Sequence, residues 1–138
     1  ARSHGKGITI LDVVEFTADS ILPRLGVRRR VASLAVHPTC SSTRLGLDSA
    51  IRKIAVAVAD DVVVPDEWGC CAFAGDRGLL HPELAASATT VEARVLAQRS
   101  FDAYVSTNRT CEIGMARATG QPYVHIVELL EQLANDCA

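Results

Sequence analysis

Four of the chain's five cysteines come a few residues after short apolar segments of the kind that form buried strands. They are Cys40, the adjacent pair Cys70 and Cys71, and Cys111. Thiolate sulfur is a soft ligand, which favours zinc or iron–sulfur centres over magnesium or calcium. It is also the nucleophile of thiol–disulfide exchange. The cysteines therefore predict a metal or redox site, provided that the fold brings them together.

Spacing alone does not choose between these chemistries. The close pair of C-x-x-C motifs that marks many zinc sites is absent. The neighbours Cys70 and Cys71 could instead form a strained vicinal disulfide, or act in thiol–disulfide catalysis. A lone cysteine is often only a small buried hydrophobic residue. We expect Cys137, one residue from the end of the sequence, to be a free thiol outside the site.

Two further side chains stand close to these cysteines in the sequence. His37 precedes Cys40 in the segment HPTC, where it could be a ligand, a hydrogen-bond donor to sulfur or a structural histidine that ends a strand. Arg77 lies in the glycine-flanked segment 75–78. Its guanidinium could offset the negative charge of a thiolate cluster, or it could be held in its own turn by Asp76.

Strand-like and helix-like segments alternate along the chain. Short apolar runs predict strands at 31–36, 61–64 and 103–107. Helical spacing and capping residues predict helices over 11–25, 47–58, 82–95, 110–119 and 124–133, with a loop over 66–78. In the helix over 82–95 the expected buried stripe is Leu84, Ala88, Val91 and Val95.

This alternation predicts an α/β fold with a small parallel sheet of three to four strands, flanked by helices in a Rossmann-like arrangement of three layers. Ligands of such sheets bind beyond the carboxyl ends of the strands. Because Cys40, Cys70, Cys71 and Cys111 all follow predicted strands, they should collect at that edge. Helix amino ends at the same edge would stabilise thiolates.

Length and composition set outer bounds. A chain of 138 residues without a linker or repeat fits one domain, 1–138. The net charge of -2 argues against nucleic-acid binding, which calls for a strong basic surface. No apolar stretch approaches the length of a membrane span. An odd number of cysteines, without the spacing of a secreted disulfide scaffold, favours a reducing cytoplasm.

Three blocks of the sequence resemble a known family, the cysteine-rich CCG domain. They are residues 37–40 (HPTC), 69–78 (GCCAFAGDRG) and 111–114 (CEIG). That domain occurs in heterodisulfide reductase B-type subunits and in the iron–sulfur subunits of glycolate and glycerol-3-phosphate oxidation. Residues 70–84 and 109–115 look more specifically like the C-terminal part of FAD-linked D-lactate (D-2-hydroxyacid) dehydrogenases. The resemblance covers residues 31–133.

The resemblance implies that this chain is the C-terminal fragment of a larger oxidoreductase. In such an enzyme a flavin oxidises the hydroxyacid, and electrons leave through iron–sulfur centres. We therefore expect an iron–sulfur electron-transfer module whose cluster can be lost from the isolated domain, with FAD on the missing part of the parent protein. The alternative is a zinc-bound or metal-free module that docks other parts of the same kind of enzyme.

The resemblance also implies partners, a location and site residues. The partners are the FAD-binding and ferredoxin-like domains of the parent enzyme. The location is the cytoplasm, with attachment to the inner face of the membrane as an option. The isolated chain is expected to be inactive, with no catalytic residue. The expected metal ligands are Cys40, Cys70, Cys71 and Cys111, with His37 and Arg77 beside the cofactor.

Two positions depart from the family pattern. Ala72 stands where the family has a glycine after its cysteine pair, and Gly114 replaces the second cysteine of its final C-x-x-C. Only one such unit is present, whereas heterodisulfide reductases pair two. The chain therefore suits one metal with up to four thiolate ligands, or a site that another part of the parent protein completes.

Overall fold

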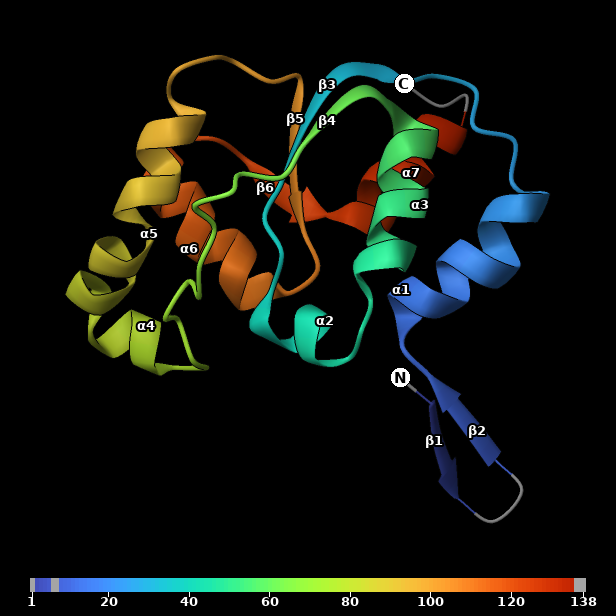
Figure 1. The fold of residues 1–138 in the computed structure, drawn as a ribbon, viewed down its shortest axis with the longest axis horizontal. Coiled ribbons are helices and arrows are strands. Elements are labelled where there is room, and N and C mark those ends of the chain that lie inside the picture. The colour runs from blue at the N-terminus through green and yellow to red at the C-terminus, as the bar shows by residue number, and fades with distance from the viewer. Residues whose placement is uncertain (1, 6–7, 136–138) are drawn as a thin grey trace.

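The computed structural model describes residues 2–5 and 8–135 and has the predicted α/β fold, a parallel sheet flanked by helices (Figure 1). The sheet has the strand order β4-β3-β5-β6. Its strands are β3 (Val31–Val36), β4 (Ala59–Val63), β5 (Ala103–Ser106) and β6 (Tyr123–His125). The helices are α1 (Val13–Phe16), α2 (Cys40–Arg44), α3 (Asp48–Val58), α4 (Arg77–Leu80), α5 (Pro82–Leu96), α6 (Arg109–Thr119) and α7 (Ile126–Ala134).

Alternating side chains of the sheet build two separate cores. Leu34 and Val36 of β3 point to one face, where they pack with buried residues of α1, α3 and α7. Ala35 and Tyr104 point to the other face and pack with Leu96 of α5 and residues of α6. Strands that are apolar on both faces are typical of a parallel sheet covered by helices on both sides. The result is the predicted three-layer arrangement.

The strand order places a topological switch point between β3 and β5. From β3 the chain crosses by α3 to β4 on one side, and from β5 it crosses by α6 to β6 on the other. The segments that leave the carboxyl ends of β3 and β5 therefore diverge and leave a crevice between them. Ligands of open α/β sheets bind at such a crevice. This edge of the sheet carries α2 and the amino end of α6 (Figure 1).

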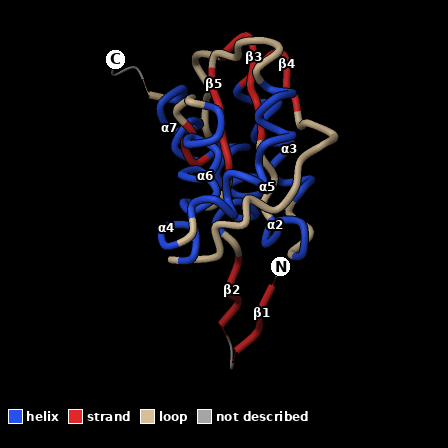
Figure 2. Tube along the Cα trace, turned by 90° about the vertical axis from the view of Figure 1, so that its left-hand side faces the viewer, coloured by secondary structure: helices blue, strands red, loops and turns tan. Residues whose placement is uncertain are grey.

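The amino-terminal region differs from the prediction of one helix over 11–25. A short antiparallel hairpin, β1 (Arg2–Gly5) and β2 (Ile8–Leu11), comes first and projects away from the helices and the main sheet (Figure 2). A helix then begins at Val13 and continues as a π-helical turn Thr17–Ile21 and a 3-10 turn Leu22–Arg24. Pro23 explains the break, because it removes a backbone donor inside the helix.

Two smaller differences concern the second half of the chain. A fourth strand, β6, occupies Tyr123–His125, where the sequence predicted the start of the last helix; that helix begins only at Ile126. A short helix, α4, lies partly within the predicted loop 66–78. Helix α6 begins at Arg109, and its cap is Asn108, whose side chain accepts from the backbone N–H of Thr110.

The buried face of α5 is not the predicted one. Leu84 and Val91 are exposed, and the buried positions are Ala85, Thr89, Glu92 and Leu96. This face is polar at its centre because it packs toward a buried histidine, as described below. Apolar periodicity alone therefore identified the wrong side of the helix.

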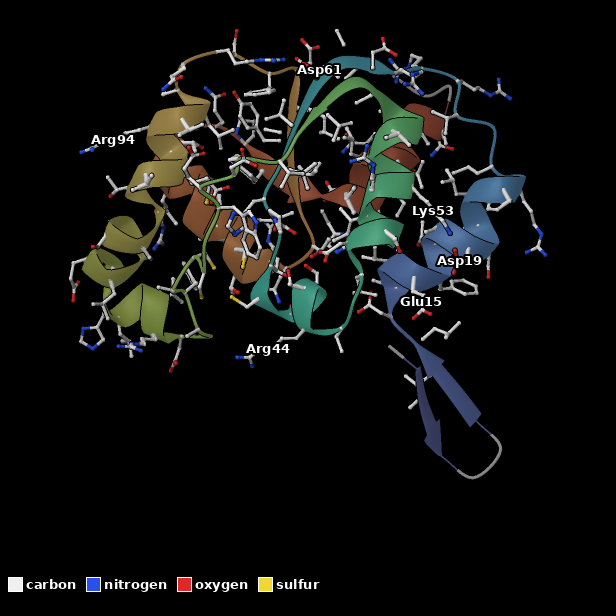
Figure 3. The ribbon with its side chains drawn as sticks, in the orientation of Figure 1. Glu15, Asp19, Arg44, Lys53, Asp61 and Arg94 are labelled. Atoms are coloured by element: carbon white, nitrogen blue, oxygen red, sulfur yellow. The ribbon has the colours of Figure 1, made fainter. Side chains whose placement is uncertain are left out.

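The first helical segment is joined to the body of the domain near the surface. In Figure 3 Lys53 of α3 and Asp19 of the π-helical turn point toward each other, and their charged atoms lie 2.7 Å apart. Exposed ion pairs of this kind contribute about 1 kcal/mol or less. Attachment therefore depends mainly on the buried side chains of Val14 and Ala18. Within residues 2–5 and 8–135, no helix combines the length and apolar character needed to cross a membrane.

Candidate metal centre

Hydrogen bonds join the segments that leave β3 and β5. The backbone N–H of His37 donates to the carbonyl of Val105 at 2.9 Å, which extends the strand pairing by one residue. The hydroxyl of Ser106 donates to the carbonyl of His37 at 3.0 Å, and the hydroxyls of Thr39 and Thr107 lie 3.2 Å apart. The backbone of His37 is thus fixed at the switch point before any ligand is considered.

Cys40 and Cys111 stand at the starts of two helices on this edge. Cys40 is the first residue of α2, whose start is fixed by a capping box between Thr39 and Ser42. Cys111 lies in the first turn of α6, after the cap formed by Asn108. Free N–H groups and the positive end of the helix dipole favour negative charge in the first turn of a helix such as α6.

The loop after β4 carries the cysteine pair to the same place. Its anchor is Phe73, which is 1% exposed and packs with Cys71 and Cys111. Gly78 makes room for this ring, because a Cβ at that position would lie 2.5 Å from the Phe73 Cγ. Ala72 has φ 52°, in the left-handed region that favours glycine. Cys71 is therefore buried, whereas Cys70 is exposed.

The sulfurs of Cys71 and Cys111 form the centre of the site. They lie 2.8 Å apart, although the two residues are separated by 40 positions in the sequence. A ring nitrogen of His37 completes a buried trio in which all three potential ligand atoms lie within 4.8 Å of one another. The convergence of the predicted strand ends is thus seen directly. The assignment of these atoms as metal ligands stays a prediction.

Cys40 and Cys70 form the outer part of the cluster. The half-exposed Cys40 thiol interacts with Cys70, and this hydrogen bond, followed by burial, raises the pKa of Cys40. The charges of both residues contribute to the raised pKa of Cys111. All four cysteines are free thiols. The fifth, Cys137, lies outside the described residues. The cluster thus has a buried pair and a pair that reaches the surface.

The two buried cysteines have pKa values shifted in opposite directions. The hydrogen bond from Cys111 is the largest influence on Cys71; burial opposes it, while His37 and the backbone N–H of Phe73 reinforce it, so that the pKa of Cys71 falls to about 4. The same hydrogen bond and burial raise the pKa of Cys111. Cys71 is therefore a thiolate at neutral pH, and Cys111 is the thiol that donates to it.

His37 is the charge partner of that thiolate. Burial alone would lower the pKa of His37, but the Cys71 thiolate and the Glu92 carboxylate raise it to about 9. Its Nδ1 lies 2.9 Å from both carboxylate oxygens of Glu92. Its Nε2 is buried and makes no hydrogen bond of normal geometry in the described part of the chain. The site thus holds a buried imidazolium between a carboxylate and a thiolate.

Glu92 is the site residue that sequence reasoning missed. It is 2% exposed and lies on the inner face of α5. A single charged residue within a helix is normally predicted to face solvent, so the residue type of Glu92 did not indicate burial. The available clue was indirect: a buried histidine at a strand end needs a partner for each ring nitrogen.

Arg77 is not among the residues that converge in the buried trio of the described chain. It is the first residue of α4, and it is exposed. The cation beside the loop is Arg117 of α6, which lies 5.7 Å from the Phe73 ring centroid and donates to the Gly78 carbonyl. A cofactor-binding role for Arg77 therefore stays a prediction without a contact to support it.

The donor set fits a thiophilic metal. Thiolate and imidazole ligands suit zinc and iron–sulfur centres, and the buried, unpaired Nε2 of His37 is the kind of polar atom that a ligand normally satisfies. At Gly114, where the resembled family has its last cysteine, an added Cβ would lie 3.4 Å from Cδ2 of Phe73 and 3.6 Å from the Cβ of Cys71. The chain thus holds up to four thiolates and one imidazole for such a centre.

Comparison with known proteins agrees with this chemistry. The chain is 27% identical over 124 residues to the glycolate oxidase iron–sulfur subunit of Escherichia coli (strain K12). The match covers 88% of this chain but 30% of that protein, so the chain spans less than a third of its relative. No protein-family model matches. The similarity and the cysteine–histidine cluster together support a cysteine-rich domain of the iron–sulfur type.

Proposed function

We propose that this chain is an iron–sulfur electron-transfer module of a flavin-linked D-2-hydroxyacid dehydrogenase of the D-lactate type. The observation that carries the proposal is the buried trio of His37, Cys71 and Cys111, bordered by Cys40 and Cys70, at the switch point of the sheet. The similarity to an iron–sulfur subunit of an oxidase supports it. The proposed unit is one domain, 1–138, at the C-terminal end of a larger oxidoreductase.

In this proposal Cys40, Cys70, Cys71 and Cys111 hold the cluster, with His37 beside it, and the cluster supplies one-electron transfer. The exposed Cys70 and half-exposed Cys40 bring the site to the surface, where electrons can enter or leave. Flavin chemistry belongs to another part of the parent enzyme, and the proposed partners are its FAD-binding and ferredoxin-like domains. The proposed location is the cytoplasm or the inner face of the membrane.

Anaerobic reconstitution tests the proposal. The reduced chain is incubated with iron and sulfide, desalted, and examined by metal analysis, visible absorption and electron paramagnetic resonance. We expect bound iron and sulfide with a visible charge-transfer band in the wild type, and loss of most of both in Cys71→Ser. Cys137→Ser is the matched control and should retain them. The proposal would be refuted if the longest available parent protein, with its wild-type sequence, bound no iron after the same treatment.

A second candidate function is a zinc-bound structural module that docks other parts of the same enzyme. The compact trio favours it, since three ligand atoms within 4.8 Å suit one small ion with tetrahedral coordination. Zinc that co-purifies at one ion per chain and resists exchange by iron would support this function over the first. Neither function allows the chain alone to oxidise D-lactate, and turnover without an added flavoprotein would contradict both.

A further inference from the structure

Glu92 occupies a position that folding alone does not explain. Both of its carboxylate oxygens lie 2.9 Å from Nδ1 of His37, and the two side chains are 2% and 0% exposed. Burying a charge pair is costly, and replacing such pairs with apolar residues often costs no stability. Of the other buried positions on α5, Ala85 and Leu96 are apolar, and the hydroxyl of Thr89 donates to carbonyls of its own helix. A buried carboxylate among them therefore points to a role for the pair beyond packing.

The two imidazole nitrogens of His37 have different surroundings. Nδ1 carries its proton toward Glu92, because a carboxylate can only accept a hydrogen bond. Nε2 is left without a hydrogen bond of normal geometry in the described part of the structure. A ring nitrogen of His37 lies within 4.8 Å of both the Cys71 and the Cys111 sulfur. Since Nδ1 is occupied, Nε2 is the nitrogen available to the site.

We propose that His37 is a nitrogen ligand of a mixed imidazole–thiolate metal centre with Cys71 and Cys111, and that Glu92 is the positioning residue that orients its ring. Histidine ligands of metals almost always donate their other N–H to a carboxylate, carbonyl or water, and this partner fixes both tautomer and orientation. The inference rests on the proposed function in that it concerns the same site, but it does not require that the metal be iron.

The remaining donors fit this assignment. Cys40 and Cys70 border the trio on its solvent side, so either thiol can complete four ligands. Position 114, where the resembled family supplies a thiolate, is glycine. With one of these two thiols, Cys40 or Cys70, the centre has three thiolates and one imidazole, and so carries less negative charge than a centre with four thiolates. Such a centre should be easier to reduce than one with thiolates alone, as in iron–sulfur centres that exchange cysteine for histidine.

Zinc is the probe for the experiment, because it binds the same donors without redox chemistry. The reduced 138-residue chain is loaded with one equivalent of zinc and examined by X-ray absorption. We expect a nitrogen shell at about 2.0–2.1 Å beside a sulfur shell at about 2.3 Å. The nitrogen shell should disappear in His37→Ala. Glu92→Gln should lower zinc affinity by roughly 10–100-fold, the usual effect of losing such a partner.

Thr89→Val is the matched control for Glu92→Gln. Thr89 lies one turn earlier on the same buried face of α5, and within the described residues its hydroxyl donates to the carbonyls of Ala85 and Ala86. This control should change zinc affinity by less than about twofold, because it removes a buried polar group without touching His37. Thermal unfolding of each variant separates lost metal affinity from lost folding.

Each outcome bears on a distinct claim. An all-sulfur shell in the wild type, or no zinc binding, overturns the assignment of His37 as ligand. This measurement uses the wild-type chain and so does not depend on a variant that could fail to fold. A nitrogen shell with unchanged affinity in a folded Glu92→Gln overturns the positioning role. If the nitrogen shell is present but the chain builds no iron centre, the inference stands and the iron–sulfur function fails. If the chain builds an iron centre but its zinc shell contains only sulfur, the iron–sulfur function stands and the inference about His37 fails.

Discussion

At the scale of single residues, proton transfer within a thiolate–imidazole pair is the main property of the site. The hydrogen bond from Cys111, reinforced by His37, lowers the pKa of Cys71 to about 4. Burial alone would lower the pKa of His37, but the Cys71 thiolate and the Glu92 carboxylate raise it to about 9. Near neutral pH the folded chain thus holds a proton on nitrogen that an unfolded chain would hold on sulfur. A cation that takes the place of this proton would bind to sulfur that is already a thiolate.

This pair predicts how stability depends on pH in a chain prepared without metal. The contribution of His37 is fully present below pH 6.5 and is lost as the pH rises through about 9. The contribution of Cys71 is present above pH 9.0 and is lost as the pH falls through about 4. Between pH 6.5 and 9 the His37 contribution falls with pH as the Cys71 contribution rises, so the two changes cancel. The pair's contribution should therefore rise from pH 4 to about 6.5 and then stay level.

Urea unfolding of the reduced wild type and of Cys71→Ser across this pH range tests the prediction. The difference in free energy of unfolding between them should grow from pH 4 to 6.5, because only the wild type has the depressed thiol pKa. A difference that stays constant with pH would show that Cys71 is an ordinary buried thiol.

At the scale of elements, the loop between β4 and α4 is held by one aromatic ring against one glycine. An added Cβ at Gly78 would lie 2.5 Å from Cγ and 2.8 Å from Cα of Phe73, and the Cα cannot move without the loop. We predict that Gly78→Ala lowers the free energy of unfolding by about 1–3 kcal/mol, the usual cost of overpacking. It should also loosen the attachment of Cys71.

Gly69→Ala is the matched control, because it lies in the same loop and its added Cβ would meet nothing within 4 Å. Its effect on stability should stay within about 0.5 kcal/mol. Urea unfolding gives the free energies, and the rate of thiol alkylation reports the exposure of Cys71. Equal effects of the two substitutions would mean that Phe73 does not anchor the loop.

The elements also show which sequence signals were sufficient. Strands β3 and β5 were predicted because their side chains are apolar on both faces, and the cysteines converge because parallel strands share a carboxyl edge. Strand β6 was missed because its three residues run directly into the helical periodicity of α7. In such a short strand the pairing with β5, a long-range contact, decides the structure.

The gathering of cysteines at this edge was predictable from the sequence, but the inner arrangement of the cluster was not. Cys70 and Cys71 are neighbours in sequence, yet only Cys71 is buried, because it packs in a cluster with Phe73 and Cys111. Glu92 could not be found from apolar spacing, because it lies on the polar, buried face of α5. Both features depend on tertiary packing, which overrides local preference.

At the scale of the whole molecule, the site joins segments that the sheet does not join. His37 and Cys111 follow paired strands and are already fixed by backbone hydrogen bonds. Cys71 instead comes from a loop whose few backbone bonds are local, such as the one from Gly78 to Phe73. A metal shared by all three would therefore restrain the loop more than the strands.

We predict that metal loading slows hydrogen exchange by local opening more in residues 65–78 than in β3 or β5. At a free metal concentration of 100 times the dissociation constant, binding should raise the free energy of unfolding by about 2.7 kcal/mol. Amides that exchange only by global unfolding should gain that amount. Loop amides should gain protection as well, because they lose their separate local opening.

Hydrogen-exchange mass spectrometry of the reduced chain, with and without zinc, measures this directly. Cys71→Ser is the control, since it removes the ligand that the loop supplies and should abolish the gain in residues 65–78. Protection that rises in the sheet while the loop is unchanged would place the metal elsewhere in the domain. Protection that rises in the loop of both proteins would show that Cys70, rather than Cys71, connects the loop to the metal.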